Sequence, residues 1–286
     1  MNNEKIMKKN FYTLPQAMYN LPNIKILLAD SSNAILYKKL DIDMLDMEKI
    51  IVSHSIVYVK SGRVTINTFD YKSYTVTDGE MLFMPKDSYL ISDYTKEGKS
   101  MEVYLFFFDH NIVSEFLQHI RLTNKSSETT PFQIQLSSNI MNFIHSMESI
   151  NYKDNNKHLL KIKLLELLHL IYEANAHFAD ILMLQGEVKD IKEYMLSHYD
   201  KNLSINDWAM LSGYSLSTFT RKFKKENGVS PKKWILEQNM KLAAKNLMEG
   251  TPVGKCASEF GYKNTSNFIK AFKEVYKTTP KQYTMT

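Results

Sequence analysis

The last hundred residues of the chain contain one sequence pattern twice. The two copies are 48 residues apart up to a Gly-Tyr pair and 49 residues apart after it, so the second copy carries one inserted residue. A repeat of this length indicates one supersecondary unit that is used twice. The shared residues are Ala209, Gly213, Tyr214, Phe219, Phe223 and Pro231 in the first copy and Ala257, Gly261, Tyr262, Phe268, Phe272 and Pro280 in the second.

Each copy predicts a short helix, a tight turn and a second helix. In the first copy Ser204 is a favourable N-cap, and Asp207 places an acidic side chain near the positive end of the helix. Gly213 is expected to end this helix, because the residue after a helix often needs a positive φ angle. Phe219 and Phe223 then recur at helical spacing. This order of elements is typical of a helix-turn-helix, whose second helix enters the DNA major groove.

The face of each second helix opposite its phenylalanines carries polar and basic side chains. Arginine bonds guanine in bidentate fashion, asparagine does the same with adenine, and hydroxyl groups bond either base type or a phosphate. Arg221 and Lys270 occupy matching positions and are expected to read bases, whereas the other lysines are expected to contact phosphates. The predicted DNA-binding residues are Ser217, Thr218, Thr220, Arg221, Lys222, Lys224, Lys225, Thr265, Ser266, Asn267, Lys270 and Lys273.

The two copies therefore share the residues that pack the helices together, but they differ in the residues that are expected to contact bases. The first presents Arg221 among small hydroxyl groups, and the second presents Asn267 and Lys270. One chain is expected to recognise an asymmetric, non-palindromic DNA element.

The runs from Ala209 to Pro231 and from Ile269 to Pro280 resemble the AraC/XylS family of bacterial transcription regulators. The resemblance implies two helix-turn-helix units joined by a long helix at about 231–247. These units would place their reading helices in successive major grooves of double-stranded DNA, about 34 Å apart. The resemblance also implies an activator that contacts RNA polymerase. The family usually has glycine where this chain has Lys277, so either the turn before Pro280 differs or Lys277 adopts a left-handed conformation at some cost.

Positive charge is concentrated in the same part of the chain. From Glu187 onward there are 17 Lys and Arg residues against 10 Asp and Glu residues, a net charge of +7, whereas the rest of the chain carries −2. This asymmetry is typical of a phosphate-binding surface. A helical domain whose charges only face water is the alternative, but it does not explain why six residue types recur in order.

The location follows from what the sequence lacks. The chain has one cysteine, Cys256, which excludes an intrachain disulfide, fits a reducing compartment and is expected to be a buried thiol. No stretch approaches 18 apolar residues, and residues 1–10 are polar and basic, so no membrane partner and no signal peptide are predicted. These observations predict a cytoplasmic protein.

The first half of the chain predicts β-structure. Short apolar and β-branched runs, such as residues 55–59 and 103–108, alternate with turn signals such as Gly62 and Asp78-Gly79. This spacing is similar to the cupin-like sensory half that is common in the AraC/XylS family. The predicted fold class is α+β, with an N-terminal cupin-like β-barrel at about 24–110, flanking helices at about 111–184, and an all-α C-terminal domain.

Helices are predicted at 112–120, 132–149 and 158–183. The last is apolar on nearly every side, which indicates burial on more than one side. It either lies within its own domain or packs one side against a second copy of the chain, as in relatives where such a helix forms the dimer. The predicted homodimer residues are Leu160, Leu164, Leu167 and Ile171.

A length of 286 residues suggests two domains. We expect a regulatory and dimerisation domain at 1–184 and a DNA-binding domain at 185–286. The helix-turn-helix units fall at about 205–226 and 253–276.

The sequence predicts no catalytic site, metal or cofactor. A cupin metal site needs a His-x-His pair with a nearby Glu and a third His, but His54 stands alone among the predicted strands. The chain is therefore predicted to be a sequence-specific transcription regulator and not an enzyme. The alternative is a cupin-type enzyme or ligand-binding protein with an accessory DNA-binding tail.

Two kinds of switch are open for the first half. A small-molecule effector would occupy a deep cavity in the barrel, near the aromatic residues of the strands. A regulatory protein would instead dock on a filled barrel with an exposed apolar patch. The aromatic candidates are Tyr58, Phe69, Phe83 and Tyr104.

Overall fold

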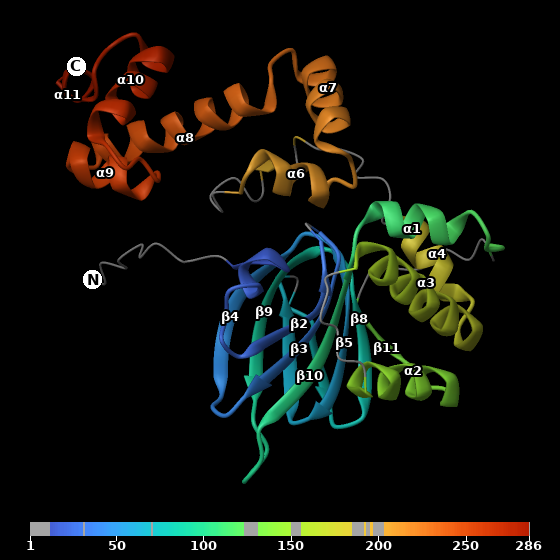
Figure 1. Ribbon diagram of the computed structural model, residues 1–286. Helices are drawn as coiled ribbons and strands as arrows, with labels where there is room; N and C mark the ends of the chain where they lie inside the picture. Colours follow the sequence, from blue (N-terminus) through green and yellow to red (C-terminus); the bar gives the residue numbers. More distant parts are fainter. Residues whose placement is uncertain are drawn as a thin grey trace. The chain divides into compact units, whose positions relative to one another are not determined.

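The computed structural model describes residues 12–30, 32–69, 71–122, 131–149, 156–184, 192, 195–196 and 203–285. The chain forms two compact units, one built mostly from residues 11–188 and the other mostly from residues 189–286. The N-terminal unit combines strands and helices, and the C-terminal unit is helical (Figure 1). The predicted boundary after residue 184 lies at the edge of residues outside the described ranges, so it stays a prediction.

Two sheets form the N-terminal unit. Neighbouring strands are antiparallel, except that β1 runs parallel to β4. The five-stranded sheet has the order β1 (Tyr12–Leu14), β4 (Met44–Ile51), β9 (Asp87–Tyr94), β6 (Arg63–Thr68) and β7 (Ser73–Thr77). The six-stranded sheet has the order β11 (Phe132–Ile134), β8 (Glu80–Met84), β5 (His54–Ser61), β10 (Met101–Phe108), β3 (Ala34–Leu40) and β2 (Ile24–Ala29).

The strand region expected at about 24–110 is confirmed, but the barrel is open. Among the described strands, none of one sheet pairs with a strand of the other, so the two sheets form a sandwich and not a closed cylinder. Sequence signals locate strands and turns, whereas closure depends on pairing between edge strands that no local pattern encodes.

The six-stranded sheet is buried on both faces, which explains its long apolar runs. Successive side chains of a strand point to opposite faces. In β10, Val103 and Phe107 belong to the core between the sheets, whereas Tyr104, Phe106 and Phe108 belong to a second core against the helices. The prediction of a buried strand at 103–108 is confirmed.

Helices cover one side of the sandwich, beside the six-stranded sheet (Figure 1). Asp109 begins the first of them by accepting hydrogen bonds from the backbone N–H groups of Asn111 and Ile112. The described helices of this unit are α1 (His110–Leu117), α2 (Ser138–Ser149), α3 (Lys157–Ala174) and α4 (His177–Leu184), with a short 3-10 helix, η1 (Gln16–Met18), between β1 and β2.

Two helix predictions need correction. The helix expected over 132–149 starts only at Ser138, because residues 132–134 pair with β8 as β11. The helix expected over 158–183 is two helices. Asn175 adopts an extended conformation after α3, and its side-chain oxygen accepts a hydrogen bond from the backbone N–H of His177 at 3.1 Å. The apolar run continues through this break, so hydrophobicity alone does not reveal it.

The four residues expected at a dimer contact face the core of their own unit. They are among the buried residues that join α3 to the six-stranded sheet and to α1, α2 and α4. A second chain would therefore have to contact other residues of α3, among which Ile162 is exposed. The buried residues are Leu160, Leu164, Leu167 and Ile171.

The C-terminal unit is built around one long helix. This helix, α8 (Pro231–Met248), confirms the helix predicted at about 231–247, and it contacts α7 as well as α9, α10 and α11 (Figure 1). Within the described ranges, no helix is both long enough and apolar enough to cross a membrane. The other described helices of this unit are α6 (Ile205–Leu211), α7 (Leu216–Asn227), α9 (Val253–Glu259), α10 (Thr265–Tyr276) and α11 (Pro280–Tyr283).

Cys256 is part of this core, as predicted. Its thiol is buried, donates a long hydrogen bond of 3.8 Å to the carbonyl of Ala243, and burial raises its pKa to about 11.

Candidate nucleic-acid interface

The first helix-turn-helix is formed by local interactions. The backbone N–H of Asp207 donates to the Ser204 hydroxyl at 3.1 Å, and the N–H of Ser204 donates to the Asp207 carboxylate at 2.9 Å. Gly213 has a φ of 76°, and the Ser215 hydroxyl accepts from the N–H of Thr218 at 3.3 Å. The predicted cap, turn and second helix are confirmed.

The second copy repeats this geometry with a longer turn. Helices α6 and α9 each have seven residues, and α7 and α10 each have twelve. Gly213 lies two residues before the cap Ser215, whereas Gly261, with a φ of 78°, lies three residues before the cap Asn264. The inserted residue therefore lengthens the turn and leaves the reading helix unchanged in length.

The phenylalanines of both reading helices are fully buried against α8 and its neighbours. Phe223 packs edge-on against Trp234 of α8 at 5.8 Å between ring centroids. Phe272 stacks on Tyr276 at 4.8 Å and meets the edge of Tyr283 at 5.5 Å. These contacts fix which face of each reading helix points outward.

On the outward face of α7, most hydroxyl groups are engaged locally. Thr220 donates to the carbonyl of Leu216 at 2.8 Å, and Thr218 accepts from Ser215 at 2.9 Å. Arg221 is exposed and has a longer reach, so it is the residue of this helix best placed to bond a base edge.

The lysines of α7 differ in their surroundings. The ammonium group of Lys222 is bonded to the Tyr214 hydroxyl and lies 4.6 Å from the centre of its ring. The Lys222 side chain is therefore held by a residue of its own helix-turn-helix. The spacing of the sequence pattern did not indicate this contact. Lys224 and Lys225 are exposed, as a phosphate contact requires.

The outward face of α10 carries side chains of a different kind. Its exposed residues include an amide and two lysines, and Lys270 occupies the position that Arg221 has in α7. Base and phosphate contacts by these residues remain predictions. The exposed residues predicted to contact DNA are Thr265, Ser266, Asn267, Lys270 and Lys273.

Two further basic residues were not predicted. Lys232 and Lys233 are exposed at the start of α8, directly after the cap Ser230. The free backbone N–H groups and the dipole at a helix N-terminus attract phosphates. The Ser-Pro-Lys-Lys run after the first reading helix is the sequence signal for this position.

Lys277 ends α10 in a left-handed conformation, which is the second of the two expected arrangements, with a φ of 61°. The matching residue of the first copy is Gly228, with a φ of 73°. Side chains other than glycine are strained there, because Cβ approaches the neighbouring carbonyl. Lys277→Gly is expected to stabilise the C-terminal unit by about 0.5–1 kcal/mol, after the entropy of the more flexible unfolded chain is subtracted.

Denaturant unfolding of the C-terminal unit measures this effect. Gly228→Ala is the matched control and is expected to destabilise the unit by a similar amount, because a Cβ at Gly228 meets nothing within 4 Å and only the backbone strain changes. Destabilisation by Lys277→Gly would contradict the strain argument.

The aromatic residues proposed to line an effector cavity do not line one. Tyr58, Phe83 and Tyr104 belong to the core between the six-stranded sheet and the helices, and Phe69 is exposed. His54 is buried and lies 5.8 Å from the rings of both Phe83 and Phe108. In the part of the chain that the structure describes, no three His, Cys, Asp or Glu side chains come together as a metal site requires.

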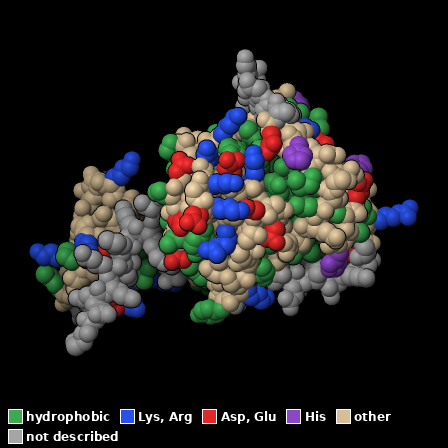
Figure 2. Space-filling model, turned by 90° about the horizontal axis from the view of Figure 1, so that it is seen from below, with side chains coloured by type: hydrophobic (Ala, Val, Ile, Leu, Met, Phe, Trp, Pro, Cys, Tyr) green, Lys and Arg blue, Asp and Glu red, His purple; other side chains and the backbone are tan. Residues whose placement is uncertain are grey.

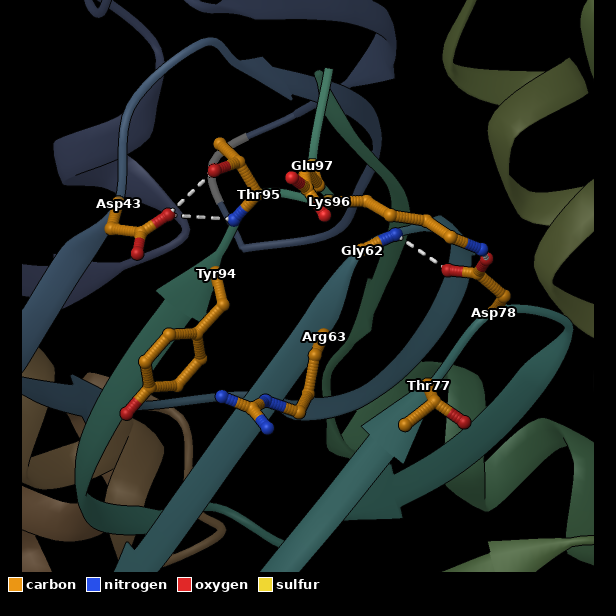
Figure 3. Close-up of a pocket in the computed structure, with 9 residues that line it drawn as sticks. All are labelled: Asp43, Gly62, Arg63, Thr77, Asp78, Tyr94, Thr95, Lys96 and Glu97. Carbon is orange, nitrogen blue, oxygen red and sulfur yellow. Dashed lines mark hydrogen bonds and ion pairs between the residues drawn. The ribbon is translucent and has the colours of Figure 1, made fainter. Parts of the chain in front are cut away.

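A polar pocket of about 590 Å³ opens at one end of the sandwich (Figure 3). Two of its carboxylates are used within the pocket wall. Asp43 accepts from the N–H and hydroxyl of Thr95, and Asp78 accepts from the N–H of Gly62 at 2.6 Å. Arg63 lies 4.2 Å from the centre of the Tyr94 ring. These contacts join the strand ends and offer no enclosed binding site.

Charge is balanced on the visible face of the N-terminal unit. Figure 2 shows a row of Lys and Arg side chains on this face, with Asp and Glu side chains on both sides of the row. The excess of positive charge is a property of the sequence from Glu187 onward, where the net charge is +7.

The fold and the outward residues define a DNA-binding protein with two helix-turn-helix units. A family model described as "Helix-turn-helix domain" matches residues 201–285, and one described as "ExsA N-terminal regulatory domain" matches residues 54–181. The chain belongs to the AraC-type family of transcription regulators.

Curated relatives agree with this assignment. The transcriptional regulator ExsA of Pseudomonas aeruginosa is 24% identical over 78% of this chain and 84% of its own length. The virulence regulon transcriptional activator VirF of Yersinia enterocolitica is 26% identical over 75% of this chain and 83% of its own length. The uncharacterized regulator YbfI of Bacillus subtilis is 29% identical, but the match covers only 35% of this chain and 38% of that protein.

These relatives are named as transcription regulators, so a cupin-type enzyme with an accessory DNA-binding tail is not favoured.

Proposed function

We propose that this protein is a transcription activator in which a single chain reads two different DNA half-sites. One observation carries the proposal: two helix-turn-helix units with the same caps and the same buried phenylalanines present different outward side chains. The equivalence of Arg221 and Lys270 supports base readout at one position in each half-site. The activator role is taken from the name of VirF, and the family resemblance adds RNA polymerase as a partner and the cytoplasm as the location.

The N-terminal unit is the regulatory half in this proposal, and the regulatory-domain model at 54–181 supports that role. A small-molecule effector is the first candidate switch. A regulatory protein is the alternative. The exposed side chains of Ile42 and Leu45, near the turn between β3 and β4, are the observation that favours it.

The proposal includes a homodimer only because the chain resembles the AraC/XylS family. Its contact would use exposed residues, since the four leucine and isoleucine side chains first expected there are buried.

Arg221→Ala is expected to weaken binding to the specific DNA element by about 1–3 kcal/mol, because a bidentate contact to one base pair is lost. Sequence preference should relax at that base pair only. Fluorescence anisotropy with the specific element and with single-base variants measures both effects at one fixed salt concentration.

The matched control is Lys245→Ala, which removes one exposed positive charge from α8 in the same unit. It is expected to change binding to all sequences slightly and equally. An equal loss for specific and unrelated DNA in Arg221→Ala would contradict base readout by Arg221.

A further inference from the structure

The turns of the two helix-turn-helix units have the same backbone hydrogen bonds up to their tyrosine. The N–H groups of Gly213 and Gly261 each donate to the carbonyl three residues earlier, at 3.0 Å and 3.1 Å. The N–H groups of Tyr214 and Tyr262 each donate to the carbonyl five residues earlier, at 2.9 Å and 3.0 Å. The extra residue of the second copy therefore follows the tyrosine.

This extra residue is Lys263. In the first copy the cap Ser215 directly follows Tyr214. In the second copy Lys263 lies between Tyr262 and the cap Asn264. The side chain of each cap accepts a hydrogen bond from a backbone N–H of the first helical turn, so the two reading helices begin in the same way.

The side chain of Lys263 is exposed, whereas its two neighbours are held within the unit. The ring of Tyr262 packs edge-on against Phe268 at 5.5 Å between centroids, and the side chain of Asn264 accepts from the N–H of Ser266 at 2.7 Å. Lys263 makes no hydrogen bond or ion pair with any residue that the structure describes. A turn that only connects two helices does not need this residue, because the first copy connects its helices without it.

The surroundings of the turn are positive. Residues 253–286 contain six lysines and two glutamates. One of these glutamates, Glu259, has its carboxylate 3.9 Å from the ammonium group of Lys255, at the other end of α9. An ammonium group without a partner in positive surroundings attracts an anion from outside, and the anions that a helix-turn-helix meets are the phosphates of DNA.

We propose that Lys263 binds a phosphate of the DNA backbone at the border of the major groove that α10 enters. The first residues of a reading helix contact base edges, so a long side chain directly before that helix reaches the backbone beside the groove. Phosphate contacts fix the register of a protein on the duplex, and this one would position Asn267 and Lys270 over their bases. The proposal rests on the proposed function, because it requires α10 to read a half-site.

A scan of the specific DNA element with single methylphosphonate groups, each of which removes the charge of one phosphate, tests this contact. Fluorescence anisotropy should show that the parent chain binds at least about threefold more weakly when the contacted phosphate is neutral. Lys263→Gln is expected to bind that DNA and the unmodified DNA equally, because its side chain has no charge to lose a partner. Lys263→Arg should restore the dependence.

The salt dependence of binding gives a second readout. Lys263→Gln should reduce the slope of log affinity against log salt by about 0.9, so its loss relative to the parent chain shrinks about threefold to fourfold between about 50 and 200 mM salt. The loss should be equal for specific and unrelated DNA, as expected for a contact that carries no sequence information. Lys245→Gln, at an exposed position of α8, is the control and should keep the methylphosphonate pattern of the parent chain.

Three results would overturn the proposal, and they can be told apart. If Lys263→Gln kept the methylphosphonate pattern of the parent chain, the phosphate contact would be wrong and the reading of two half-sites would stand. A loss confined to the specific element would assign Lys263 to a base and not to a phosphate. Absence of specific DNA binding by the parent chain would overturn the proposed function together with this contact.

Discussion

Phe272→Ala is expected to destabilise the second helix-turn-helix by about 3–5 kcal/mol, since a fully buried aromatic side chain is replaced by a cavity. The ring of Phe272 packs against Phe268 and Tyr276 of its own helix and against Tyr283 of α11. Its loss would leave an empty space between α10 and the neighbouring helices α8 and α11. Amide hydrogen exchange should show faster opening of α9 and α10, while the strands of the N-terminal unit keep their protection.

The matched variant is Phe223→Ala, at the same position of the first copy. Its ring contacts Phe219 and Trp234, so the same loss is expected for α7. In a footprint on the specific DNA, each variant should lose protection over a different half of the element. Loss of protection over the same half in both variants would contradict the assignment of one half-site to each unit.

Gly62→Ala is expected to destabilise the N-terminal unit by about 3 kcal/mol or more. Gly62 has a φ of 99°, and a Cβ there would lie 2.6 Å from the carbonyl oxygen of Tyr94 and 3.0 Å from the side chain of Met101. The variant combines backbone strain with a clash against backbone that cannot move without disturbing β9. Urea denaturation monitored by tyrosine fluorescence or far-UV circular dichroism measures the change.

Gly79→Ala separates the two causes. Gly79 has a φ of 76°, but a Cβ there meets nothing within 4 Å, so only the backbone strain of about 1 kcal/mol is expected. If the two variants were equally stable, the close approach at Gly62 would not contribute.

The sequence predicted those features that local chemistry determines. The turn at Gly213, the N-cap at Ser204 and the end of α10 at Lys277 all depend on a few adjacent residues. The long helix at about 231–247 was expected from the family resemblance, and in the structure Ser230 and Pro231 mark its start. The repeat strengthened the prediction of the helix-turn-helix units, because the helix and turn signals occur in both copies.

Features that depend on distant residues were missed or only partly predicted. The apolar helix at 158–183 gave no preferred face, so the sequence left burial within the domain and a contact with a second chain as alternatives. Phe132–Ile134 read as helix because its partner, β8, lies some fifty residues earlier. Lys222 was assigned to a phosphate, since its position on the helix does not reveal Tyr214 as a neighbour.

A buried charge cluster in the sandwich, in which Lys38 and Lys49 both bind Asp93, shows the same limit. Lys38 and Lys39 are adjacent in β3, and either one reads as a solvent-facing residue. The pairing of Lys38 with Val103 and Ile24 in neighbouring strands turns it inward, and Asp93 arrives from a strand 55 residues later. The cluster therefore becomes visible only once the strand register is known.

Selection of binding sites from random DNA, performed with the parent chain and with the Arg221→Ala and Lys270→Ala variants, tests the central claim most directly. The account predicts a non-palindromic motif with two blocks one helical turn apart, in which each variant loses sequence preference in one block only. A palindromic motif, or loss in the same block for both variants, would contradict two unlike half-sites read by one chain.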